Sequence, residues 1–470
     1  MKTEIVNPNI HNFIKSLRDV GYTFEIAVAD VLDNSISANA KNITIYTVAE
    51  PEIIFCMLDD GYGMDEVELK EAMRLSSKDP DDLRDTKDLG KFGLGLKTAS
   101  FSQCKQLTVI SKKEKKTSLK QWDLEYISNN NEWLLITPEI DDFKDIPLMN
   151  ELNGLEEGTL VIWQDIDRYN ERTFSTHIEK LRKHLSLVFH RFLSGVNSIS
   201  ISLNNKDLIP FDPFNIDNEA TQRISTEKIK IYNRNINITP YVLPHHNKTS
   251  QEEWEEYSTD DGYIKSQGFY LYRANRLLIH GTWWGLHKAI DAHKLIRIKI
   301  DIGNDQDKYW GIDIKKSTAN PMPEIRNDLK RVISEVIKEG VKPFTRRARN
   351  IKDRTTTRFW NIMPLGDDEF RFGLNKEHPL YQDLISSIPV EKLSLIDIYL
   401  KGLEAYLPLE SIQANLQQKP HQLKQETALS KEDIEQLVNK LKSQGLTEEY
   451  IENLLKTELF KNNRELFENA

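Results

Sequence analysis

The chain has 470 residues, which is too long for one ordinary domain, so two or three domains are expected. Its 39% hydrophobic and 29% charged residues are normal for a folded globular protein, and the net charge of −10 excludes a histone-like polycation but not a local basic stripe that binds nucleic acid. Two cysteines, an N-terminus without the apolar core of a signal peptide and no apolar run near the ~20 residues of a membrane span favour the cytoplasm.

A helix is predicted over residues 25–38, where apolar residues recur at helical spacing. Asp30 and Asn34 are four residues apart, so they face the same side of this helix. A carboxylate on that side can orient and deprotonate a water molecule, and an amide one turn later can ligate Mg²⁺ between phosphates. Taken alone, the pair also fits a solvated helix face. Asp33 is expected to be an acid on the helix surface.

Two strands are expected over residues 42–50 and 51–60, and the second runs into a D-x-G-x-G turn. Glycines in such a turn allow a flat ligand to approach the backbone and allow positive φ angles. A carboxylate at the strand end can accept a hydrogen bond from the N6 amine of adenine, with a methionine packed near the base. The residues of this candidate adenine site are Asp59, Gly61, Gly63 and Met64. Asp60 is the competing carboxylate, and an acidic turn without a ligand is the alternative.

A glycine motif follows an amphipathic helix predicted over 66–77 and a polar loop over 78–90. Its glycines are Gly90, Gly93 and Gly95, and a helix is predicted to begin among them. The backbone N–H groups of Gly93, Leu94, Gly95 and Leu96 would point at phosphate oxygens at the start of this helix. Lys97 is the preferred cation for the phosphates over Lys78 and Lys91, although a solvated lysine is the alternative. The pattern is not a Walker A motif.

These three motifs, AVADVLDNSISANA, LDDGYGM and GKFGLGLKTAS, resemble in their order the Bergerat nucleotide site of the GHKL superfamily, which includes gyrase B subunits, the ninety-kilodalton heat-shock chaperone, histidine kinases and MutL. The resemblance implies that Asp30 is the general base, that Asn34 binds Mg²⁺ and that residues 78–90 form the ATP lid. The usual base is Glu, so the shorter Asp30 predicts either slow hydrolysis or a backbone that is shifted to compensate. Residues 1–24 either strap across a partner subunit, as in dimeric members, or pack on their own domain.

Further strands are predicted over 107–113, 121–127, 132–138, 158–166 and 198–205, with a helix over 173–194. Thr159 belongs to a Gly-Thr pair that occupies the place where the superfamily supports its lid and phosphates. Together these elements predict a first domain over residues 1–212, an α+β sandwich of the Bergerat type with helices on one face of the sheet.

A second α/β domain is predicted over residues 213–350. Its stretch YLYRANRLLIHG, and the motifs of the first domain, look most similar to Microrchidia (MORC) ATPases. In that family and in gyrase the second domain is a transducer that sends a lysine to the γ-phosphate. Lys315 and Lys316 are adjacent in a predicted strand and must face opposite ways, so only one can reach the nucleotide. We favour Lys316; the alternatives are Lys315 or two surface lysines.

The densest basic segment runs from Lys342 to Arg358, with seven basic residues and one acid. Such a stripe predicts salt-dependent binding to double-stranded DNA, although a solvated interdomain helix is equally consistent. Residues 351–470 are predicted to form a mostly helical interaction region, with helices over 391–416 and 430–460.

The resemblance therefore implies an ATPase that uses Mg²⁺, closes into a homodimer when ATP binds and clamps DNA. Prokaryotic MORC-like proteins resemble parts of restriction or antiphage systems, so a partner nuclease or defence protein is a further expectation. A chaperone-like protein clamp, which suits the acidic net charge, and an ATP sensor that does not hydrolyse ATP remain the alternatives. A histidine kinase is disfavoured because no phosphoacceptor helix precedes the site.

Overall fold

The computed structural model describes residues 3–4, 9–75, 95–231, 234–313, 315–316, 318–340, 356–365, 369–418, 420–423, 429–443 and 447–461. Gly90, Gly93 and Leu94, the predicted lid and all but the last residues of the basic segment lie outside this description. The chain divides into two compact units, one of Met1–Pro244 with Glu255–Val341 and the other of His245–Trp254 with Lys342–Ala470. In the described part, no helix is long and apolar enough to cross a membrane.

The first sheet has seven strands in the order β4-β3-β5-β2-β1-β6-β7. Its strands are β1 (Asn42–Val48), β2 (Ile54–Asp59), β3 (Gln106–Lys113), β4 (Lys116–Asp123), β5 (Gly158–Gln164), β6 (Ser200–Leu203) and β7 (Lys206–Asp207). The pair β1–β6 is parallel and the other neighbouring pairs are antiparallel. The helices around it are α1 (Ile10–Arg18), α2 (Phe24–Ser37), α3 (Glu66–Met73), α4 (Gly95–Gln103), α5 (Leu124–Asn130), η1 (Ile140–Phe143), α6 (Met149–Gly154), α7 (Glu171–Val188) and α8 (His190–Leu193).

Both faces of this sheet are buried. Along β2, Phe55 and Met57 enter the larger core, which α2, α4 and α7 cover, because alternate residues of a strand face opposite sides. Cys56 and Leu58 point the other way, into a smaller core with residues of η1 and α6. The mixed α and β class predicted from the sequence is confirmed, although the sheet is covered on two faces rather than one.

The strands predicted over 121–127 and 132–138 are wrong for most of their length. β4 ends at Asp123, whose carboxylate accepts hydrogen bonds from the backbone N–H groups of Glu125 and Tyr126, both at 2.9 Å. This N-cap begins helix α5 and so ends the strand. Of the second segment, only Ile136 forms a bridge, to Gln121.

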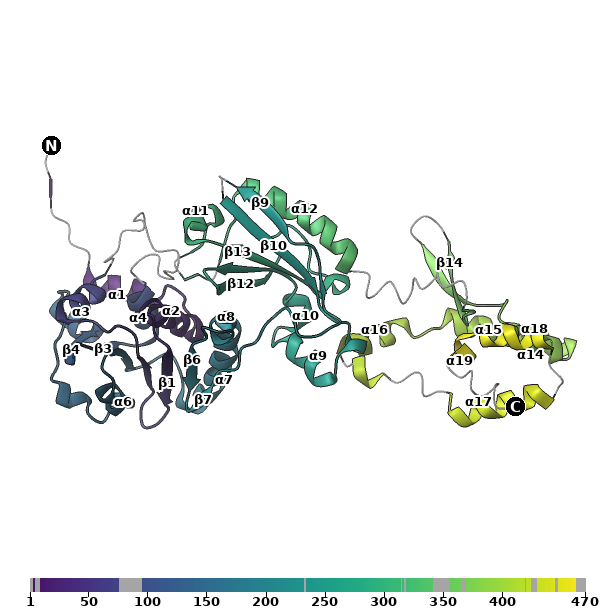
Figure 1. Ribbon diagram of the computed structural model, residues 1–470, viewed down its shortest axis with the longest axis horizontal. Helices are drawn as coiled ribbons and strands as arrows, with labels where there is room; N and C mark the ends of the chain where they lie inside the picture. Colours follow the sequence, from purple (N-terminus) through teal and green to yellow (C-terminus); the bar gives the residue numbers. More distant parts are fainter. Residues whose placement is uncertain are drawn as a thin grey trace. The chain divides into compact units, whose positions relative to one another are not determined.

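The second sheet, in the same compact unit, has six strands, with the order β12-β11-β13-β10-β8 and β9 beside β10. Its strands are β8 (Gln222–Arg223), β9 (Glu227–Ile231), β10 (Arg234–Val242), β11 (Gly268–Arg273), β12 (Arg276–Thr282) and β13 (Ile296–Ile302). Its helices are α10 (Gly262–Lys265), η3 (Asp291–His293), η4 (Asn304–Gln306), α11 (Asp307–Trp310) and α12 (Pro323–Gly340), while α9 (Gln251–Ser258) is divided between the two units. Figure 1 shows α12 beside this sheet, and the buried apolar residues of α12 belong to the same core as those of the strands.

The other unit contains the hairpin of β14 (Trp360–Pro364) and β15 (Phe370–Leu374) and a set of helices. These are η2 (His246–Lys248), α14 (Pro379–Ser387), α15 (Val390–Ala405), α16 (Leu409–Gln418), η6 (Pro420–Gln422), α17 (Lys431–Ser443), α18 (Glu448–Leu455) and α19 (Glu458–Lys461). The single helix predicted over 391–416 is two helices, because Pro408 lacks the N–H that would continue α15. The domain boundaries at 212 and 350 stay predictions.

Candidate functional site

Asp59 is the last residue of β2, and its carboxylate is buried at 4% exposure. Ser35 Oγ, from α2, donates to Oδ2 at 2.7 Å, and the N–H of Gly61 donates to Oδ1 at 3.0 Å. Burial raises the pKa of Asp59 to about 6, although these two hydrogen bonds act in the opposite direction. The carboxylate is therefore held in one orientation in a poorly solvated position, which suits recognition of a specific donor.

The glycines after Asp59 are required by close packing at two different points. Gly63 has φ +62°, and a Cβ there would lie 2.0 Å from the carbonyl oxygen of Lys112. Gly61 does not need a positive φ; a Cβ there would lie 2.8 Å from the Cβ and the carbonyl oxygen of Ala38. The turn thus packs directly against β3 and the end of α2, and larger residues would push it away.

Thr159 lies beside Asp59 in the sheet, as the residue of β5 paired with it. Its hydroxyl lies 2.8 Å from Ser111 Oγ of β3, which accepts a hydrogen bond from the N–H of Met64 at 2.8 Å. The Gly-Thr pair predicted from sequence is therefore connected to the D-x-G-x-G turn through Ser111. Sequence reasoning missed Ser35 and Ser111, although Ser35 lies inside the first motif.

Asp60, the competing carboxylate, is occupied by the start of β1. It accepts hydrogen bonds from the N–H groups of Lys41 and Asn42 and from Asn42 Nδ2, at 2.7 to 2.9 Å. Partial burial acts to raise the pKa of Asp60, but these hydrogen bonds outweigh it and hold the pKa below its ordinary value. Asp60 thus stabilises the strand start, while Asp59 faces α2.

Asp30, on α2, has a fully buried side chain that is surrounded by donors. Tyr22 donates its hydroxyl to Oδ2 at 3.1 Å, while Arg276 Nη2 and Lys316 Nζ donate to Oδ1 at 3.3 and 3.2 Å. The two cations belong to the second sheet and the loop after it, more than 240 residues away in the chain. The catalytic carboxylate expected from the first motif is thus linked directly to the second sheet and the loop that follows it.

Asp33 was expected on the helix surface, and this expectation is wrong. Its side chain is 1% exposed, and its Oδ2 accepts a hydrogen bond from Lys316 Nζ at 2.6 Å. Arg276 Nε lies 2.9 Å from Oδ1, an ion pair without hydrogen-bond geometry. Burial raises the pKa of Asp33, while Arg276 and Lys316 oppose that shift. The second sheet covers this side of α2, which the helix pattern alone does not reveal.

Lys316 and Lys315 come from a turn rather than from the predicted strand. The N–H of Lys316 donates to the carbonyl of Asp313, and the N–H of Thr318 donates to the Asp313 carboxylate at 3.0 Å. Lys316 has φ +54°, a conformation that is uncommon for a residue with a side chain. The turn directs Lys316 to the two acids, whereas Lys315 Nζ donates to the carbonyl of Gly21, at 3.4 Å.

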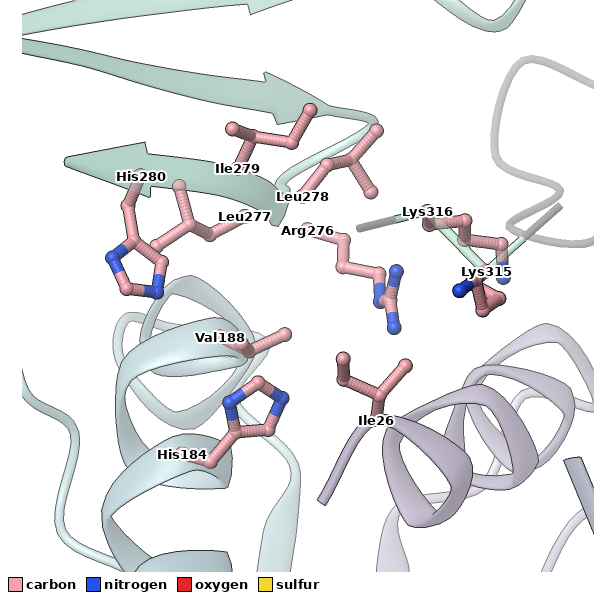
Figure 2. Close-up of a pocket in the computed structure, with 10 residues that line it drawn as sticks. All are labelled: Ile26, His184, Val188, Arg276, Leu277, Leu278, Ile279, His280, Lys315 and Lys316. Carbon is pink, nitrogen blue, oxygen red and sulfur yellow. The ribbon is translucent and has the colours of Figure 1, made fainter. Parts of the chain in front are cut away.

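Arg276 is a site residue that the sequence analysis did not identify. It begins β12, directly after a tight turn in which Ala274 and Asn275 both have positive φ. Figure 2 shows its side chain extending toward α2, beside Lys315 and Lys316. A cavity of about 160 Å³ adjoins the cluster, and the ionisable residues that line it are all basic: His184, Arg276, His280, Lys315 and Lys316.

Four further predicted residues lie on α2 and α4. Asn34 is exposed one turn from Asp30, and its Nδ2 donates to the Asp30 carbonyl at 3.2 Å. Gly95 begins α4, where a Cβ would meet no atom of the described residues within 4 Å, and Leu96 packs on the core. Lys97 is 3% exposed and donates from Nζ to the carbonyl of Ala72 at 2.8 Å, so contact with a phosphate would require this side chain to leave α3.

This arrangement defines an α/β nucleotide-binding domain with one buried carboxylate at a glycine turn and another at a helix. Residues 22–159 match the family model described as "Histidine kinase-, DNA gyrase B-, and HSP90-like ATPase". The matched segment runs from Tyr22, which contacts Asp30, to Thr159, which pairs with Asp59. The superfamily predicted from the three motifs is confirmed for this segment, which is an ATPase domain of the GHKL type. No curated protein matches the chain.

Proposed function

We propose that the chain is a MORC-like ATPase that uses Mg²⁺ and works as a conformational switch. The observation that carries this proposal is the cluster in which Arg276 and Lys316 reach Asp30 and Asp33. If Lys316 moves from these acids to the phosphates of a bound nucleotide, the contacts between the second sheet and α2 change. Chemistry at the nucleotide and the arrangement of the two sheets are coupled by the same side chains.

The candidate site offers the contacts that Mg·ATP needs. Asp59 accepts the N6 amine of adenine, and Met64 packs near the base. The backbone of the motif from Gly90 to Leu96, with Lys97 and Thr159 beside it, supports the phosphates. The exposed amide of Asn34 fits a magnesium ligand because amide oxygens suit this ion. Bound Mg²⁺ would neutralise charge on the phosphates.

Asp30 acts as the general base for a water molecule in this proposal. While Tyr22, Arg276 and Lys316 all donate to its carboxylate, these donors occupy the positions from which a water molecule would donate to it. When Lys316 turns to a phosphate, Oδ1 of Asp30 keeps Arg276 but loses its second donor, and a water molecule can take that place and give up its proton. Hydrolysis would then occur only with the lysine on the nucleotide.

The proposed switch acts on DNA as an ATP-dependent homodimer. The segment from Lys342 to Arg358 carries the charge needed to neutralise several backbone phosphates. A clamp that closes around long DNA is consistent with a role in restriction or antiphage defence beside a partner nuclease or defence protein. The observations that support these finer assignments are the basic segment and the resemblance of residues 270–281 to MORC proteins.

A second candidate is an ATP sensor that does not hydrolyse ATP. The short Asp in place of Glu, and the occupation of Asp30 by two cations, both favour it. A protein clamp instead of a DNA clamp suits the net charge of −10.

These candidates are separated by measuring Mg·ATP turnover with and without long double-stranded DNA, at two salt concentrations, beside the variant Asp30→Asn. We expect slow turnover that DNA stimulates, that salt weakens and that the variant loses while it still binds ATP. Turnover indifferent to DNA would support the protein clamp. ATP binding without turnover in the wild type would support the sensor.

A further inference from the structure

Asp33 has no role in the chemistry proposed above, and Arg276 enters it only as a donor to Asp30, yet both are buried with Asp30 and Lys316. The two carboxylates and the two cationic side chains form one cluster of ion pairs with equal numbers of each. Lys316 Nζ lies closer to Asp33 than to Asp30, at 2.6 Å against 3.2 Å. The stronger hold on the lysine is thus exerted by the acid that is not the base.

Carboxylate and phosphate oxygens are acceptors of the same kind for a lysine ammonium group, since both carry negative charge. Lys316 must therefore give up contacts with Asp33 and Asp30 to reach a phosphate. After that move, the two acids would be left buried with Arg276 as their cation. A buried carboxylate without a nearby positive charge is unfavourable, so the arginine limits the cost of releasing the lysine.

We propose that Asp33 competes with the ATP phosphates for Lys316, and that Arg276 makes this exchange favourable by neutralising Asp30 and Asp33 after the lysine has left. This inference rests on the proposed contact of Lys316 with the nucleotide. Asp33 and Arg276 are positioning residues, because they act through Lys316. Together they set the affinity for ATP and the threshold at which the second sheet responds to it.

The two residues have opposite effects on nucleotide affinity. Asp33→Asn removes the closer competitor, so Lys316 binds phosphate more readily and the affinity for a non-hydrolysable ATP analogue rises about tenfold. In Arg276→Gln, Lys316 is the cation that remains beside both acids. The two acids therefore hold the lysine more tightly, and the affinity for the ATP analogue falls about tenfold. The double variant again has equal numbers of acids and bases, so its affinity returns toward that of the wild type.

The test measures the affinity for a non-hydrolysable ATP analogue and for ADP by calorimetry, each with Mg²⁺. ADP lacks the γ-phosphate, so the ratio of the two affinities isolates the contribution of Lys316 from general damage to the site. We expect this ratio to rise in Asp33→Asn, to fall in Arg276→Gln and to recover in the double variant. Arg276→Lys keeps the charge and is expected to remain near the wild type, which provides a second measurement if Arg276→Gln does not fold.

The matched control is Arg191→Gln, which removes the ion pair from α8 to Asp301 of β13, at 2.5 Å, without touching Lys316. It weakens packing between the same two sheets and is expected to leave the ratio unchanged. Ratios that move in the same direction in both single variants, or that do not move, would overturn the inference. A wild type with equal affinity for the analogue and ADP would instead overturn the proposed contact of Lys316, and a wild type that binds neither would overturn the proposed function.

Discussion

Asp59 is predicted to lower the stability of the folded protein in exchange for nucleotide recognition. Burial raises its pKa to about 6 from an ordinary value of 3.8. The folded state binds the Asp59 proton more tightly than the unfolded state does. Protonation of Asp59 therefore contributes to the free energy of unfolding, and this contribution is fully present below pH ~4 and is lost as the pH rises through about 6. Above that window the ionised carboxylate costs about 3 kcal/mol.

Asp59→Asn removes this charge and keeps a side chain of the same shape. The amide oxygen can still accept from Gly61, and its NH₂ group can donate to Ser35. We therefore expect the variant to be more stable than the wild type at pH 7.5, by up to about 3 kcal/mol, and equal to it near pH 4. ATP affinity should fall about tenfold, because a neutral acceptor binds the adenine amine less strongly than a carboxylate does.

The assay is thermal and urea unfolding of both proteins from pH 4 to 8, together with ATP affinity over the same range. The ratio of the wild-type ATP affinity to that of Asp59→Asn should decrease as the pH falls through about 6. The protonation of ATP itself affects both proteins equally and cancels in this ratio. Asp60→Asn is the matched control and should destabilise the protein, because its carboxylate accepts backbone hydrogen bonds that hold β1. An Asp59→Asn protein less stable than the wild type at pH 7.5, or one that binds ATP normally, would refute this reasoning.

Gly63→Ala should lower the free energy of unfolding by about 2 kcal/mol, since its Cβ would collide with a carbonyl of β3. The control is Gly154→Ala, whose Cβ meets no atom of the described residues within 4 Å. Urea unfolding compares the two variants, and equal losses of stability would contradict the packing argument. Lys316→Ala should destabilise the protein by about 3 kcal/mol or more, because it leaves two buried acids with one cation, and should abolish turnover. Lys315→Ala should change both little; a larger loss of turnover in this variant would reverse the assignment of the two lysines.

The turn at Asp59 could be predicted from the sequence because its determinants are local. The order of Asp59, Gly61 and Gly63 follows from the strand end and from the need for φ +62° at Gly63, and the structure contains this turn. Ser35, which donates to Asp59, lies in the first motif and not in this turn, and it could have been identified there. By contrast, the strand predicted over 121–127 failed because apolar alternation does not reveal that Asp123 caps a helix.

The sequence by itself determined the superfamily of the first domain, the placement of Asp30 and Asn34 on one helix and the carboxylate at the glycine turn, since each depends on residues close together in the chain. The tertiary structure decided that Asp33 is buried, that Arg276 belongs to the cluster and that Lys316 rather than Lys315 reaches Asp30 and Asp33. These features arise where a loop and a hairpin of the second sheet meet α2. Helical periodicity records only that a side chain faces outward from the helix, and packing of a distant segment determines whether that side is solvent or a buried ion pair.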